Sequence, residues 1–332
     1  REQSNNSMSD KHYQPMSRNF SQMTVFFRNR TSAAVIAFLV LSNTVALAWA
    51  VYEWSDIPAM TNPYPLIDFS RSFIPQKNFI TNVQPLRDSL QKITKERKLD
   101  NASIYFEYLQ TGANISINPE VRVYPASLLK LPTAIAVMNK IEKGEWQPDS
   151  KLVLFASDID PNYGNTYYAH PVGTTFTIEE LLKAILIESD NTAHRIIIRN
   201  LSTEDLAVMR DSMGLEEVLD SNQRLSAKEY SRVFRALYYA SAINREHSEQ
   251  LLRWLSETPF TDFLESGLPP GIGFSHKIGK GGPQKTYLDS GIVYLSGRPY
   301  LLSVAIAGRD EQEAKAIMRE ISQTVYNYVA NQ

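Results

Sequence analysis

The stretch YPASLLKLPTAIAVMNKIEKGEW, residues 124–146, determines how the rest of the chain is interpreted. It predicts a helix that begins after Pro125 and ends at Gly144, with apolar residues of core character along it. Ser127 and Lys130 stand three positions apart among these apolar neighbours, so a helix places them on one face. In a structural interpretation Ser127 caps the helix and Lys130 extends its amine to water. In a chemical interpretation Ser127 is a nucleophile and Lys130 is its base.

The composition excludes several kinds of protein and site. The chain has 332 residues, and its 34 Lys and Arg nearly balance its 36 Asp and Glu, which leaves a net charge of −2. Because there is no basic excess, no nucleic-acid partner is expected. The absence of cysteine excludes disulfides, thiolate catalysis and cysteine-bound zinc. No metal or other cofactor is expected, and structural or surface roles are favoured for the five histidines, which show no metal-ligand spacing: His12, His170, His194, His247 and His276.

The N-terminal part predicts a membrane anchor. Residues 1–30 are polar and predict a disordered cytoplasmic tail. Residues 31–52 are uncharged and long enough to span the lipid bilayer, and Arg28 and Arg30 precede them. The positive-inside rule then predicts a single-pass protein of the cell membrane, with a cytoplasmic N-terminus and everything after the span outside.

The alternative for this segment is a signal peptide. Ala48-Trp49-Ala50 fits the small-x-small pattern of a cleavage site, and cleavage after Ala50 would make the protein secreted. Residues 53–84 contain recurring prolines without periodicity, which predicts an extended stalk between the span and the main domain.

Residues 85–332 predict one α+β domain. Its antiparallel sheet joins N-terminal and C-terminal strands, with flanking helices and an inserted all-helical subdomain. Alternation on either side of Thr111-Gly112-Ala113 predicts a hairpin, and Thr177 followed by Glu180 predicts a capped, buried helix. Helices are expected at 85–99, 177–201, 226–241, 244–258 and 311–332, and further strands at 271–279, 286–297 and 298–308.

Two further motifs place polar residues in apolar surroundings. Ser189-Asp190-Asn191 lies in the buried helical segment, where each polar group needs a partner, and a helix break is its structural alternative. His276-Lys277-Ile278-Gly279 lies on an otherwise apolar strand. There the lysine either protects a sheet edge or supplies a cation to an anionic substrate, and the glycine allows a ligand to approach the backbone.

Together and in this order, the three motifs resemble the signature of the penicillin-binding-protein and β-lactamase superfamily, most closely class A β-lactamases. The resemblance extends over residues 84–332, since the segments around the second motif and after the third are also similar to the family. It implies a β-lactamase/transpeptidase-like fold, preceded here by one N-terminal transmembrane helix.

The resemblance also implies roles for individual residues. Ser127 would be the acylated nucleophile, Lys130 its base, and Ser189 a proton relay to the leaving nitrogen. Lys277 would attract the substrate carboxylate. The substrate-binding residues would be Asn191, Gly279, Lys280 and Tyr163. Asn191 would hold Lys130 and the substrate amide, and Tyr163 would lie at the rim of the cleft. The backbone N–H groups of Lys280 and Ser127 would form an oxyanion hole.

The sequence departs from the family at three places. Ile278 replaces the threonine of the third motif and offers no hydroxyl, and Ser290 stands where class A members often carry an arginine. The loop that holds the deacylating glutamate of class A enzymes is shortened. Its carboxylates, Glu216, Glu217 and Asp220, are typical of solvated turn residues.

These observations predict a membrane-anchored serine hydrolase outside the cytoplasm. It forms an acyl-enzyme with a β-lactam or with a D-Ala-D-Ala-type peptidoglycan stem peptide. One alternative is a DD-peptidase-like cell-wall enzyme that turns lactams over poorly, because loss of a general base costs about a hundred- to ten-thousandfold in rate. The other alternative is a non-catalytic penicillin-binding sensor or scaffold. The sequence leaves the oligomeric state open.

Overall fold

The computed structural model describes residues 30–55, 80, 82–164, 167–212, 214, 224–282 and 284–332. The chain divides into two compact units, Arg1–Asn62 and Pro63–Gln332. In the first unit, helix α2 spans Arg30–Ser55 and exposes apolar side chains such as Phe38 and Leu41. Within the described residues, no helix is both long and apolar enough to cross a membrane. The membrane anchor and the stalk therefore stay predictions.

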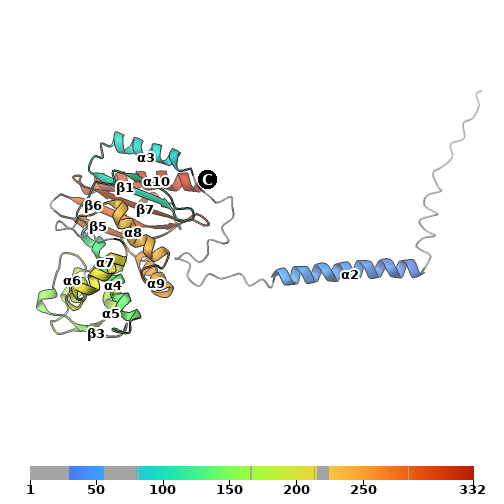
Figure 1. Ribbon diagram of the computed structural model, residues 1–332, viewed down its shortest axis with the longest axis horizontal. Helices are drawn as coiled ribbons and strands as arrows, with labels where there is room; N and C mark the ends of the chain where they lie inside the picture. Colours follow the sequence, from blue (N-terminus) through green and yellow to red (C-terminus); the bar gives the residue numbers. More distant parts are fainter. Residues whose placement is uncertain are drawn as a thin grey trace, which may run out of the picture. The chain divides into compact units, whose positions relative to one another are not determined.

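A five-stranded antiparallel sheet with the order β2-β1-β7-β6-β5 forms the centre of the second unit (Figure 1). The hairpin β1–β2 pairs with the C-terminal strand β7, so the sheet joins strands from both ends of the domain, as the sequence predicted. Strand β5 lies at one edge, and its only strand partner in the described sheet is β6. The strands are β1 (Ala102–Tyr108), β2 (Ala113–Ile117), β5 (Gly273–Gly281), β6 (Thr286–Tyr294) and β7 (Tyr300–Ile306).

Each face of the sheet is covered by its own hydrophobic core. Ile104 and Phe106 of β1 pack with helices α3 (Gln84–Glu96) and α10 (Glu311–Ala330), whereas Tyr105 packs with the helices on the opposite face. Successive side chains alternate in this way because a strand has a period of two. Figure 1 shows α3 and α10 together on one side of the sheet and α8 (Ala227–Tyr238) crossing the other.

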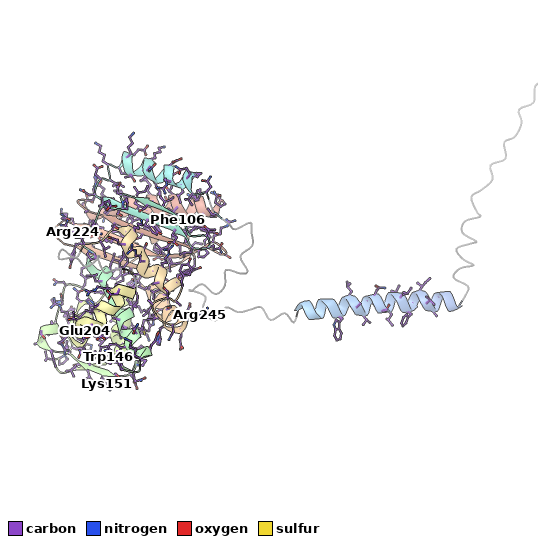
Figure 2. The ribbon with its side chains drawn as sticks, in the orientation of Figure 1. Phe106, Trp146, Lys151, Glu204, Arg224 and Arg245 are labelled. Atoms are coloured by element: carbon purple, nitrogen blue, oxygen red, sulfur yellow. The ribbon has the colours of Figure 1, made fainter. Side chains whose placement is uncertain are left out.

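The helical part of the domain is inserted between β2 and β5. The expectation that this part is all-helical is wrong, because it includes a two-stranded sheet, β3 with β4. Helix α7 was also not predicted. Trp146 and Lys151 lie at the end of the domain opposite α3 (Figure 2). The helices and strands of this part are α4 (Lys130–Glu142), β3 (Lys151–Val153), β4 (Thr175–Thr177), α5 (Ile178–Lys183), α6 (Asn191–Asn200), α7 (Thr203–Ser212), α8 and α9 (Arg245–Ser256).

The predicted continuous helix over residues 177–201 is wrong. Thr177 and Glu180 form the expected capping box, but α5 passes into a π-helix, η6 (Ala184–Glu188), and the chain then leaves the helix at Ser189. Ser189 has a left-handed backbone with a φ of 58°, and α6 restarts with Asp190 as its N-cap. The break has a local cause, because Ser, Asp and Asn favour caps and turns over helix interiors.

His276 forms a buried ion pair that joins β5 to β6 and to the short turn η7 (Glu265–Gly267). Its Nδ1 lies 2.8 Å from Asp289 Oδ1 and its Nε2 lies 3.2 Å from Glu265 Oε2, while the imidazole is fully buried. Burial opposes a charge here, but the carboxylates of Asp289 and Glu265 raise the pKa of His276 to about 9. The histidine therefore carries a structural charge close to the third motif.

This ion pair predicts a loss of stability at high pH. The folded-state pKa lies above the unfolded value, so the stabilisation is complete below about pH 6.5 and disappears as the pH rises through about 9. A difference of this size corresponds to at most about 3 kcal/mol. Urea unfolding of the wild type and of His276→Gln should show a difference in unfolding free energy that narrows between pH 6.5 and pH 9. A constant difference would contradict the assignment, and His247→Gln, at a partly exposed pair with Glu142, is the control.

Candidate active site

A pocket of about 290 Å³ lies where the helical part meets the edge strand β5. Most of the residues that the sequence singled out line it, together with neighbours that the sequence did not indicate. The lining residues are Tyr124, Ala126, Ser127, Leu129, Lys130, Asp160, Tyr163, Asn191, His194, Arg195, Lys280, Gly281 and Gly282.

Ser127 lies in a 3₁₀ turn, η3 (Ala126–Leu129), directly before α4. The expected helix therefore begins with a tighter turn, and Pro125, not Ser127, is its N-cap residue. Ala126 has a φ of 49°, a left-handed backbone that is costly for a residue with a Cβ. Strain of this kind persists where the surrounding structure enforces it and is frequent beside functional groups. Here it directly precedes the half-buried side chain of Ser127.

Lys130 is held at the centre of a set of oxygen atoms. Its Nζ donates to the carbonyl oxygen of Ser189 at 2.5 Å and to Oδ1 of Asn191 at 2.7 Å. The hydroxyl oxygens of Ser127 and Ser189 both lie 3.2 Å from the same nitrogen. Because only 2% of Lys130 is exposed, the structural interpretation in which it extends to water is wrong.

Burial lowers the pKa of Lys130 to about 8, against the opposing negative charges of Asp190 and Asp160. A neutral amine has two N–H groups and one lone pair. The two neighbours that can only accept, the Ser189 carbonyl and Asn191 Oδ1, take the two N–H groups. The remaining position on the nitrogen faces the two hydroxyls: the ammonium form donates there, and the neutral amine can accept a proton from one of them. Lys130 is therefore arranged to accept a proton from Ser127.

The break after the π-helix positions the second motif. The left-handed Ser189 turns both its hydroxyl and its carbonyl to Lys130, and the buried Asp190 accepts a 2.7 Å hydrogen bond from the Ala193 N–H at the start of α6. Asn191, the first residue of α6, donates its backbone N–H to the Tyr163 carbonyl at 3.1 Å. The three motif residues thus have different tasks: Ser189 and Asn191 contact the lysine, and Asp190 caps the helix.

Tyr163 and Lys280 face each other at the rim of the pocket. The Nζ of Lys280 lies 5.7 Å from the centre of the Tyr163 ring, and both residues line the pocket. Gly279 precedes Lys280 on β5 and passes against the turn that carries Ser127. A Cβ at Gly279 would lie 2.6 Å from the Pro125 carbonyl oxygen. Only glycine allows β5 to come this close to the serine.

The close approach at Gly279 predicts the effect of a single methyl group. We expect Gly279→Ala to push η3 and β5 apart, to destabilise the domain by about 1–3 kcal/mol and to slow the reaction of Ser127. Gly273→Ala on the same strand is the control, since its Cβ would lie 3.5 Å from the nearest atom. Chemical unfolding of both variants measures the effect. Equal stability of the two would show that the turn adjusts without strain.

Lys277 occupies a different place from the other predicted site residues. It is 1% exposed, and its Nζ donates to the carbonyls of Ile185 and Leu186 in the π-helix at 3.1 Å each. Burial and the charge of Lys130 lower the pKa of Lys277 well below its usual value. It is not among the residues that line the described pocket, although β5 is an edge strand.

Among the residues that line the pocket, sequence reasoning missed three with titratable side chains close to Lys130 or Asn191: Asp160, His194 and Arg195. Asp160 forms a 2.6 Å ion pair with Arg195, and His194 Nε2 lies 3.0 Å from Thr133 Oγ1. Burial and the charges of Lys130, Lys277 and Arg195 lower the pKa of His194 to about 3, so it is neutral. Asp160 stands in the same loop as Tyr163, and Arg195 one helical turn after Asn191, but no local pattern distinguishes them.

Two of the three departures from the family pattern lie within the described residues, and both are buried side chains. Ile278 is buried in the core on the α10 face of the sheet, and Ser290 is buried opposite Lys277 in the β5–β6 register. Neither adds a hydroxyl or a charge to the described pocket lining. Glu216, Glu217 and Asp220 lie outside the described residues.

Comparison with known proteins matches residues 85–329 to the beta-lactamase enzyme family. The chain is 24% identical over 268 residues to the beta-lactamase VEB-1 of Pseudomonas aeruginosa, covering 72% of this chain and 90% of the relative. It is 25% identical over 247 residues to the beta-lactamase CTX-M-8 of Citrobacter amalonaticus, covering 69% and 84%.

Solved structures share the fold. PBP-A superposes with a TM-score of 0.69 at 20% identity, over 75% of this chain and 97% of that one. An ancestral class A beta-lactamase superposes with a TM-score of 0.67 at 23% identity, over 73% and 99%. A variant of PBP-A, solved as an acyl-enzyme complex with penicillin G, has a TM-score of 0.67 at 20% identity, over 75% and 98%.

Proposed function

This chain belongs to the beta-lactamase enzyme family of serine hydrolases, and we propose that it opens amide bonds of β-lactams or D-Ala-D-Ala-type peptides through an acyl-enzyme on Ser127. The observation that carries the proposal is the set of contacts around Lys130, which directs a nitrogen of lowered pKa to the Ser127 hydroxyl at 3.2 Å. Attack by the Ser127 oxygen on the substrate carbonyl forms the acyl bond as the proton passes to Lys130.

The proton must then reach the leaving nitrogen. The Ser189 hydroxyl lies 3.2 Å from Lys130 Nζ and is placed to pass that proton on as the carbon–nitrogen bond breaks. The backbone N–H groups of Ser127 and Lys280 are proposed to bind the developing oxyanion, since both residues line the pocket.

Deacylation is expected to be slow. Asp160 is the carboxylate in the described pocket lining, and its oxygens are already bound by Arg195 at 2.6 Å and by the backbone and side-chain nitrogens of Asn162 at 3.0 and 2.7 Å. Despite partial burial, these contacts lower the pKa of Asp160. A carboxylate bound in this way is a poor general base for water. This favours the second candidate, a DD-peptidase-like enzyme that turns lactams over poorly.

The experiment that tests the proposal is a time course of intact-mass spectrometry after penicillin G is added to the full chain. We expect a mass increase of one penicilloyl unit, located on the Ser127 peptide, that persists for hours. Decay within minutes would mean efficient turnover and a deacylating base outside the described residues. The absence of any adduct on folded protein would reject the β-lactam reaction.

The lysine base also predicts the pH dependence of acylation. Because Lys130 acts in its neutral form and its pKa is about 8, the rate constant should rise with pH and level off above about 8. Below that value each pH unit should cost about tenfold in rate. Stopped-flow or quenched-flow acylation between pH 5.5 and 9.5 measures this profile. A flat profile below pH 8 would exclude Lys130 as the base.

The location of the domain outside the cytoplasmic membrane is also a proposal. It is supported by the uncharged run at 31–52 and by the two arginines that precede it. If the segment is an anchor, the protein stays with the membrane fraction after extraction with alkaline carbonate, and external protease degrades the domain. Release into the soluble fraction would reject the anchor but not the export of a form cleaved after Ala50.

A further inference from the structure

A second pocket, of about 700 Å³, borders the same two chain segments as the pocket that contains Ser127. Arg122 lines the second pocket, whereas Ser127, a few positions later in the same segment, lines the first. Along the β5–β6 hairpin, residues 281–282 line the first pocket and residues 284–285 line the second. A ligand in the second pocket would therefore lie beside the candidate active site without entering it.

The described lining of this second pocket is mainly basic, and we call it the basic pocket. Its charged residues are the cations Arg122, Arg224, Lys285 and Arg309 and the acid Asp310. Asp310 is the N-cap of α10, where its Oδ1 accepts a 2.8 Å hydrogen bond from a backbone N–H of the first turn. The chain as a whole has a net charge of −2, so the positive charge is concentrated here. Clefts lined mainly by one sign of charge attract ligands of the opposite sign.

All four cations keep hydrogen-bond donors for a ligand. Arg224 and Lys285 are exposed and have no ion-pair partner among the described residues. Arg122 pairs with a carboxylate oxygen of Glu229 through a single nitrogen. Arg309 donates one N–H to a carboxylate of α10 and two to backbone carbonyls just after α3. A guanidinium has five N–H groups, so both paired arginines can bind a ligand without losing their structural partners.

A smaller pocket of about 230 Å³ continues the basic pocket and makes room for an elongated ligand. The two pockets share Arg309 and its neighbours at the end of β7, and the smaller one adds Lys98 and Asp100 to the charged lining. A ligand that carries several negative groups along a chain can thus contact Lys98 in one pocket and Lys285 in the other. A single small anion would use only a part of this space.

The kind of donor in the two pockets favours phosphate groups. Arginine binds phosphate oxygens with paired N–H groups, and a tetrahedral phosphate offers oxygens in several directions to cations from separate segments. The described lining contains no aromatic side chain on which a nucleic-acid base could stack. We therefore propose that the basic pocket binds a linear phosphate polymer without bases and holds it beside the candidate active site.

Binding of short-chain sodium polyphosphate to the full chain tests this directly. Isothermal titration calorimetry at several salt concentrations measures the affinity. We expect Arg224→Gln combined with Lys285→Gln to weaken binding at least about tenfold, because hydrogen bonds between charged groups are the stronger ones. The slope of log affinity against log salt concentration should also become shallower by about 1.5, since two fewer contacts with the polymer release counterions.

Lys143→Gln combined with Lys151→Gln is the matched control. It removes the same two positive charges from exposed lysines of the helical part, outside the described lining of both pockets, and should leave the affinity unchanged. Equal weakening in the two double variants would overturn the inference, because it would show a response to net charge alone. Wild-type affinity in the Arg224 and Lys285 variant would overturn it as well.

Two comparison ligands test the chemical class. Polyglutamate carries carboxylates in place of phosphates and should bind more weakly than polyphosphate, and equal affinity would reject the preference for phosphate. Vesicles of phosphatidylglycerol present phosphates on a flat surface. If the wild type binds these vesicles through Arg224 and Lys285 but does not bind polyphosphate, the polymer is wrong and the basic pocket contacts a membrane. The readout is binding and not chemistry, so this inference and the acyl-enzyme proposal fail independently.

Discussion

Ser127→Ala is expected to abolish the covalent adduct and to reduce turnover at least about ten-thousandfold, as removal of a catalytic nucleophile does. The reason is geometric: Ser127 Oγ is the hydroxyl in the described pocket that lies both in the open cavity and 3.2 Å from Lys130. Ser189 lies at the same distance from the lysine, but it is only 2% exposed, which leaves Ser127 as the hydroxyl open to attack a substrate carbonyl. Intact-mass spectrometry with penicillin G measures the adduct directly.

The variant should remain folded and keep its binding affinity, since the Ser127 side chain makes no capping hydrogen bond in its turn. Ser150→Ala, in a loop of the helical part, is the control and should form the adduct at the wild-type rate. An adduct of the same mass on Ser127→Ala, located on another residue, would place the nucleophile elsewhere. Retained affinity together with a wild type that forms no adduct would instead favour a non-catalytic binding protein.

Lys130→Arg is expected to lower the acylation rate by about a hundred- to ten-thousandfold while the positive charge is kept. Arginine cannot be deprotonated in proteins, so it cannot take the proton of Ser127. It can still donate to the Ser189 carbonyl and to Asn191, which makes the variant a test of the base and not of the charge. The rise in rate with pH towards 8 should disappear together with the base.

Rapid-quench acylation measurements on Lys130→Arg and on Lys140→Arg provide the comparison. Lys140 lies on the same helix, where it pairs with Glu145 and Asp205, and its replacement by arginine should leave acylation unchanged. A Lys130→Arg variant with wild-type rates would show that the lysine supplies only a charge. A variant that unfolds is recognised by circular dichroism, and Lys130→Gln, which is smaller and neutral, then takes its place in the same comparison.

The sequence predicted most elements of the fold because their signals are local. The alternation around Thr111-Gly112-Ala113, the capping box at Thr177 and the apolar strands at the C-terminal end each depend on residues a few positions apart. The continuous helix over 177–201 is wrong, since the pattern of buried residues persists through the π-helix, and the helix break that Ser189-Asp190-Asn191 offered as an alternative is confirmed. The short strands β3 and β4 have only three residues each and left no periodicity to detect.

In the candidate site too, local sequence motifs predicted some residues, and residues whose contacts are distant in the sequence were missed. Three short motifs were sufficient to bring Ser127, Lys130, Ser189 and Asn191 under consideration, and the structure brings all four together. The pocket residues Asp160 and Arg195 escaped notice because their partnership spans 35 positions of sequence and follows no motif. The resemblance assigned the carboxylate of the substrate to Lys277 and only a backbone N–H to Lys280, whereas the structure buries the side chain of Lys277 and leaves that of Lys280 partly exposed.

The sequence by itself therefore determined the type of chemistry, since a serine and a lysine three residues apart on a helical turn must share a face. The tertiary structure alone decided the state of that lysine. Its lowered pKa arises from burial, and its lone pair is directed by acceptors 59 and 61 residues away in the chain. Desolvation and hydrogen-bond geometry depend on which distant segments pack around a group, and no local pattern of residues records them.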